Sequence, residues 1–95
     1  MTAQEKAIIE STNRDMIKAA KQFVSFFHVA LTMAAAHHDR RMLEQLEQAA
    51  IHYRDHLGKY IDLCGDAAID TEVLVLHDYF VENAADIRAA LKAGV

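Results

Sequence analysis

Apolar residues recur at spacings of three, four and seven along three segments of the chain, which is the spacing of one face of an α-helix. These segments cover about residues 3–37, 40–64 and 71–93. A Thr-x-x-Glu capping box, Thr2 with Glu5, predicts the first helix start, and Asp39 and Asp70 are the expected N-caps of the other two. We therefore predict a single all-α domain over residues 1–95, a three-helix antiparallel bundle with a long first helix.

The second and third predicted helices each carry one apolar stripe, which is typical of helices that pack on one side. In the third helix the stripe consists of Val73, Leu76, Phe80, Ala84, Ile87 and Leu91. In the second it consists of Met42, Leu46, Ala49, Tyr53, Leu57, Tyr60, Ile61 and Cys64. Glu47 belongs to the opposite, polar face of the second helix. Gly58 predicts a kink or a close helix contact, because glycine disfavours a helix interior.

The first predicted helix is apolar around most of its circumference. From Phe23 to Ala36 its polar side chains are Ser25, His28 and Thr32, which lie on one line at spacings of three and four. A helix that is apolar nearly all round is buried on nearly all sides. Two further helices of a 95-residue chain do not easily cover it. The residues in question include Phe23, Phe26, Phe27, Val29 and Met33.

A second copy of the chain would cover the apolar surface that the other two helices leave exposed, because it offers the same surface in a symmetric contact. A monomer with an exposed apolar groove and a membrane-spanning segment are the alternatives. A span needs about 20 apolar residues, whereas the apolar segment here is 14 residues long and contains His28. We therefore predict a homodimer that completes its core between two first helices, and no membrane contact.

Composition narrows the functional classes. The net charge is -4, and residues 49–95 carry four basic and eight acidic side chains, which argues against nucleic-acid binding. A single Cys excludes a disulfide-stapled fold, and Met1–Glu5 lacks the apolar stretch of a signal peptide, so we expect a cytoplasmic protein. The chain has neither a Gly-rich phosphate loop nor a Gly-x-Ser-x-Gly elbow. We therefore expect neither an enzyme nor a bound cofactor.

Histidines offer one alternative chemistry. His52 and His56 are four residues apart, which places both imidazoles on one helix face, as in many zinc sites. If the second and third helices pair antiparallel about a turn near Ala67, His77 lies level with His56 and Glu82 lies level with His52. Two ligands do not make a site, and partly exposed helix histidines are the simpler interpretation. A metal-binding or metal-sensing bundle that uses His52, His56 and His77 is the alternative hypothesis.

The favoured function is that of a small regulatory or adaptor protein that binds another protein and inhibits or sequesters it. A transcription regulator or a defence complex would be a suitable target. Helical bundles do this by presenting an apolar groove or a charged helix face. One candidate surface is the part of the apolar segment that a dimer leaves uncovered. The other is an acidic row on the third helix, formed by Asp78, Glu82 and Asp86.

Overall fold

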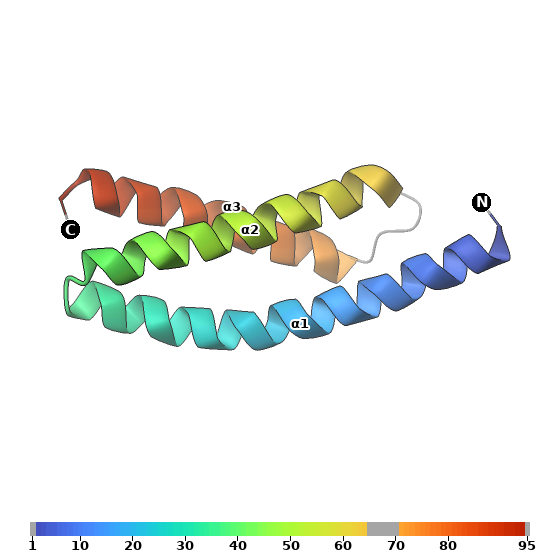
Figure 1. The fold of residues 1–95 in the computed structure, drawn as a ribbon, viewed down its shortest axis with the longest axis horizontal. Helices are drawn as coiled ribbons and strands as arrows, with labels where there is room; N and C mark the ends of the chain where they lie inside the picture. The colour runs from blue at the N-terminus through green and yellow to red at the C-terminus, as the bar shows by residue number, and fades with distance from the viewer. Residues whose placement is uncertain (1, 65–70, 95) are drawn as a thin grey trace.

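The computed structural model describes residues 2–64 and 71–94, which form three α-helices (Figure 1). These are α1 (Ala3–Ala36), α2 (Arg40–Cys64) and α3 (Thr71–Lys92). The α2 helix runs antiparallel to α1, and α3 runs antiparallel to α2 and packs against it most extensively. The described residues confirm the all-α class and the three predicted helices. The predicted ends of α1 and α3 differ from the observed ends by one residue.

Side-chain caps define the starts of α1 and α2, as the sequence predicts. Thr2 Oγ1 accepts a hydrogen bond from the backbone N–H of Glu5 at 3.1 Å. Asp39 Oδ1 accepts one from the backbone N–H of Met42, also at 3.1 Å. Between the two helices His38 has a φ of 52°. This left-handed conformation allows the chain to reverse between the end of α1 and the start of α2.

An aromatic cluster joins the three helices at the centre of the core. Phe27 of α1 and Phe80 of α3 are completely buried and meet edge to face, with ring centroids 6.2 Å apart. Phe23 stacks on Tyr53 of α2 at 4.5 Å, and Tyr53 stacks on Phe80 at 5.1 Å. Burial raises the pKa of the Tyr79 hydroxyl beside Phe27. The rest of the buried apolar core consists of Ala20, Ala34, Leu43, Leu46, Ala50, Leu57, Val73, Leu76, Ala84, Ile87 and Leu91.

The predicted stripe of α3 is confirmed, since all six of its residues are buried. The stripe of α2 is only partly right. Leu43 and Ala50 are buried instead of Met42 and Ala49, which are exposed and half-buried. These residues show that the buried face of α2, which packs against α1 and α3, is wider than the predicted stripe. Glu47, assigned to the polar face, is buried as well.

Gly58 marks a close contact between α2 and α3. A Cβ atom at this position would lie 3.3 Å from Nε2 of His77, which is tighter than ordinary van der Waals contact. The close helix contact that the sequence offers as one explanation of this glycine is therefore the one observed. The side chain of Cys64 and the expected N-cap Asp70 lie outside the described part of the chain.

The first turns of α1 extend past the ends of α2 and α3, which gives the molecule its long dimension of 51 Å (Figure 1). Residues 3–8 are all exposed. Just beyond them, the Tyr60 hydroxyl of α2 donates a hydrogen bond to the carbonyl oxygen of Ile9 at 2.8 Å. Farther along, Lys21 Nζ lies 2.7 Å from Glu72 Oε1 at the start of α3. These two contacts hold α1 against the other helices.

Phe27→Ala is expected to lower the free energy of unfolding by about 3–5 kcal/mol, because it deletes a completely buried ring. Phe26→Ala removes the same atoms at the next position, where the side chain is exposed, and should cost less than about 1 kcal/mol. Urea unfolding of both variants, at a protein concentration where light scattering gives the mass of the monomer and followed by circular dichroism at 222 nm, measures the difference. Equal losses would contradict the assignment of Phe27 to the core and Phe26 to the surface.

Candidate functional site

Three large apolar side chains lie exposed on the outer face of α1. Phe26, Val29 and Met33 are 65 %, 58 % and 57 % exposed. Their spacing of three and four residues places them in one line along the helix. We call these three residues the α1 strip. They are the part of the predicted apolar segment that the other two helices of the same chain leave uncovered.

Phe27 and Phe23, which the sequence groups with this surface, belong to the core. Phe27 is completely buried, and half-buried Phe23 stacks on Tyr53. The expectation that Phe27 contacts another chain is therefore corrected, because its ring is enclosed by Tyr79 and Phe80 of its own chain. An α-helix turns by about 100° per residue. Neighbouring positions such as 26 and 27 therefore face different surroundings.

A groove borders the α1 strip on the side of α2. Its volume is about 380 Å³, and its far wall is the exposed side chain of Met42. The walls are mainly apolar, with Ala30 and Ala34 at the base and His37 at the end of α1. Asp39 also lines the groove, but its carboxylate already accepts the N-cap hydrogen bond from Met42. This wall was not predicted, because the sequence pattern places Met42 in the buried stripe.

The outer face of α3 combines acidic and apolar side chains. Asp78, Glu82 and Asp86 are all exposed and four residues apart, as the sequence predicts. Two large apolar residues, Leu74 and Val75, are exposed one turn before them. Spacings of three and seven place Val75 in line with Asp78 and Glu82. The predicted stripe leaves Leu74 and Val75 out, but the sequence pattern assigns these two residues no role on the outer face.

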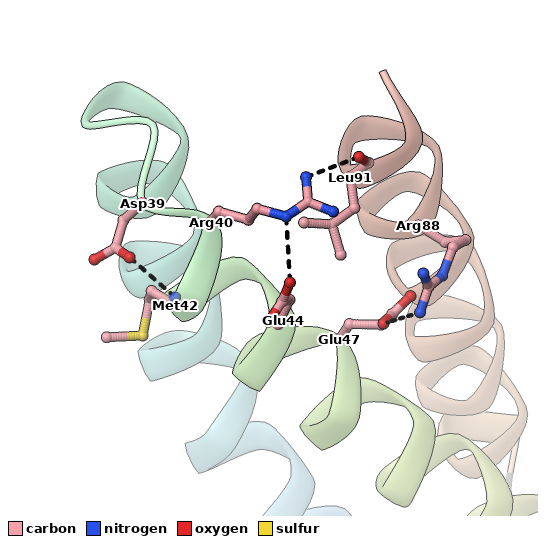
Figure 2. A network of polar contacts seen from close by, with 7 residues as sticks. All are labelled: Asp39, Arg40, Met42, Glu44, Glu47, Arg88 and Leu91. Carbon is pink, nitrogen blue, oxygen red and sulfur yellow. Dashed lines mark hydrogen bonds and ion pairs between the residues drawn. The ribbon is translucent and has the colours of Figure 1, made fainter. Parts of the chain in front are cut away.

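An ion pair and a hydrogen bond join this helix to α2 near the C-terminal end of the acidic row (Figure 2). Glu47 is only 3 % exposed, and its Oε1 lies 2.6 Å from an Arg88 guanidinium nitrogen. Arg40 donates a hydrogen bond to the carbonyl oxygen of Leu91 at 2.9 Å and lies 3.3 Å from Glu44. Buried charges are tolerated when they are paired and hydrogen-bonded. These contacts fix α3 against α2, so the outer face of α3 has a defined orientation relative to the rest of the bundle.

The histidines of the alternative hypothesis lie on different sides of α2. The rings of His52 and His56 are stacked with centroids 6.2 Å apart, and they line a groove of about 310 Å³ between α1 and α2 that also contains Asp15. His77 lies in the groove between α2 and α3, beside Gly58. Two residues of helix correspond to about 200° of rotation, which separates the faces of His56 and Gly58.

This separation decides what the histidines can do. Within residues 2–64 and 71–94, no group of three His, Cys, Asp or Glu side chains is placed to hold a metal ion. The predicted cluster of His52, His56 and His77 with Glu82 is therefore not assembled in this structure. The register of α2 and α3 is close to the expected one. However, His52 and His56 lie on the side of α2 that borders α1, whereas His77 lies against the side that contains Gly58.

Protein purified without a histidine tag is expected to contain well under one zinc ion per chain, because two imidazoles without a third ligand bind zinc weakly. Inductively coupled plasma mass spectrometry of the purified protein measures the metal content. One zinc per chain that is lost in His56→Ala and retained in His38→Ala would contradict this expectation and would favour the metal-binding hypothesis.

In the part of the chain that the structure describes, no helix is long and apolar enough to cross a membrane. Comparisons with protein-family models, with curated proteins and with solved structures return no match to this chain.

Proposed function

We propose that this chain is a small non-enzymatic interaction protein of the cytoplasm, which forms a homodimer and acts by binding another protein. In this role it is a regulator or adaptor that inhibits or sequesters its target. The observation that carries the proposal is the α1 strip: Phe26, Val29 and Met33 are each more than half exposed and border a groove. Soluble proteins rarely expose such apolar patches unless the patches serve as contact surfaces.

The chemistry of the α1 strip supports a protein contact. Aromatic and Met side chains are enriched at protein interfaces, where they act as anchors in well-packed pockets. Phe26 and Met33 are residues of this kind, and the adjacent groove of about 380 Å³ offers a concave apolar surface. A flexible thioether such as that of Met33 or Met42 adapts its shape to the surface it meets.

The outer face of α3 supports a second contact of different chemistry. Asp78, Glu82 and Asp86 present three negative charges in one row, and exposed Leu74 and Val75 lie beside its first member. A basic amphipathic segment complements this surface, with its cations on the acidic row and an apolar side chain on Val75. Complementary charge of this kind steers encounter and raises the association rate more than it tightens the final complex.

The use of polar groups within the fold supports a non-enzymatic role. Glu47 is the buried charged residue of the described chain, and it forms an ion pair with Arg88. Asp39 caps α2, and Arg40 binds a carbonyl oxygen of α3. These groups stabilise helix ends and helix pairs. Catalysis instead requires polar groups that converge on a substrate position.

The target protein can be identified with a photo-crosslinking amino acid in place of Glu82. We expect this variant to capture a specific protein from cells of the source organism, because position 82 lies in the middle of the acidic row. The same crosslinker at Gln48, which is exposed on α2, is the matched control. Proteins captured equally from both positions would not be targets of the α3 face, and capture of none from position 82 would contradict the proposal.

Replacing Asp78, Glu82 and Asp86 together with Lys is expected to slow association with the captured protein by about tenfold or more at low salt. The dissociation rate should change less, because exposed rim charges contribute mainly to encounter. Surface plasmon resonance over a range of salt concentrations measures both rates. An association rate and a salt dependence unchanged from those of the original chain would show that the acidic row takes no part in binding.

A further inference from the structure

The α1 strip lies in the middle of a long uncharged segment. Residues 22–38 contain no Asp, Glu, Lys or Arg. At the border of this segment, Lys21 is already paired with Glu72 of α3. The polar residues beside the strip include exposed Ser25 and Thr32, whose short side chains carry no charge. Thr32 donates its hydroxyl to the carbonyl oxygen of His28.

An uncharged apolar surface is complementary to itself. When two copies of one face meet about a twofold axis, residue i of one copy contacts residue j of the other, and residue j contacts residue i. Charged residues of one sign in such a face would lie near like charges of the other copy and oppose the contact. The segment 22–38 contains no such residues, whereas the outer face of α3 carries three negative charges and would repel its own copy. The α1 strip is therefore the surface that can contact its own copy, whereas the outer face of α3 suits a basic partner.

We propose that the α1 strip is the contact surface for a second copy of this chain, and that the two α1 helices pair antiparallel about a twofold axis at Val29. This inference rests on the proposed function, because it gives the geometry of the homodimer and leaves the α3 face for the target protein. Val29 is the central residue of the strip. Phe26 precedes it by three residues and Met33 follows it by four.

The position of the groove sets the direction of the pairing. The groove extends from Phe26 towards the C-terminal end of α1, where Met33, His37 and Met42 line it. In an antiparallel pair centred on Val29, the Phe26 ring reaches Met33 of the partner subunit and enters this groove. Contacts between a sulfur atom and an aromatic ring are favourable. In a parallel pair, the Phe26 rings would instead meet each other, and the grooves would stay empty.

The charged first half of α1 favours the same direction. It carries Arg14 and Lys18 as exposed cations, and a parallel pair would place each of them alongside its own copy. In the antiparallel pair the two extended halves project in opposite directions and do not meet. The helix macrodipoles are also opposed in the antiparallel arrangement, which lowers their interaction energy.

Single cysteines introduced in a Cys64→Ser background test this geometry by oxidation, because disulfides form only between closely placed Cα atoms. Val29→Cys, on the axis, should form a covalent dimer. Gln22→Cys and Ala36→Cys should each stay monomeric alone but crosslink when the two variants are mixed, because the axis brings position 22 opposite position 36. Ala89→Cys, an exposed site on α3, controls for random collisions and should stay monomeric.

Self-crosslinking of Gln22→Cys and of Ala36→Cys would overturn the antiparallel arrangement in favour of a parallel one.

Light scattering at micromolar concentration should give twice the mass of 10.7 kDa for the original chain, and Phe26→Ser should raise the dimer dissociation constant by about tenfold or more. A monomeric original chain without a Val29→Cys crosslink would overturn the second copy as the occupant of the strip. Capture of a target from position 82 in that case would leave standing the part of the proposed function that concerns binding of another protein.

Discussion

Phe80 contacts aromatic rings from both other helices, and this contact sets the arrangement of the molecule. Its ring centroid lies 5.1 Å from that of Tyr53, 6.0 Å from that of Phe23 and 6.2 Å from that of Phe27. Aromatic pairs at such distances contribute beyond simple area burial. Because Phe23 and Phe27 must both point at Phe80, the rotation of α1 about its own axis is fixed. That rotation turns Val29 and Met33 away from the cluster, so the exposure of the strip follows from the packing of the core.

The helices and their ends were predictable because the signals are local. Capping residues such as Thr2 and Asp39 act on backbone groups within one turn, and the six buried residues of α3 form one stripe at regular helical spacing. The faces of α1 and α2 were less predictable. In both helices apolar residues also lie outside a single stripe, and the sequence does not show which of them pack against the other two helices. Met42 and Glu47 were placed on the wrong sides for this reason.

The candidate surfaces were predictable in different degrees for the same reason. The acidic row of α3 is exposed because its charged residues recur at every fourth position. They therefore lie on the helix face opposite the apolar stripe, and that face points to solvent when the stripe is buried. The α1 strip required a choice among several apolar neighbours. Phe26 and Phe27 are chemically identical, and only the tertiary packing of the aromatic cluster sends one ring inward and the other to the surface. The separation of His56 from His77 likewise depends on the rotation of α2.

The extension of α1 beyond its neighbours divides one continuous helix into parts of unequal local stability. Around Phe27 one face of the helix packs against aromatic rings, and we expect its amide protons to exchange with solvent only when the bundle opens as a whole. Residues 3–8 are exposed on every side, so their amides depend on the Thr2 cap and on helix propagation alone. Protection against exchange should rise steeply near Ile9, where the Tyr60 hydroxyl first attaches the helix to the bundle. The N-terminal turns can therefore unwind and reform while the core and the α1 strip keep their shape.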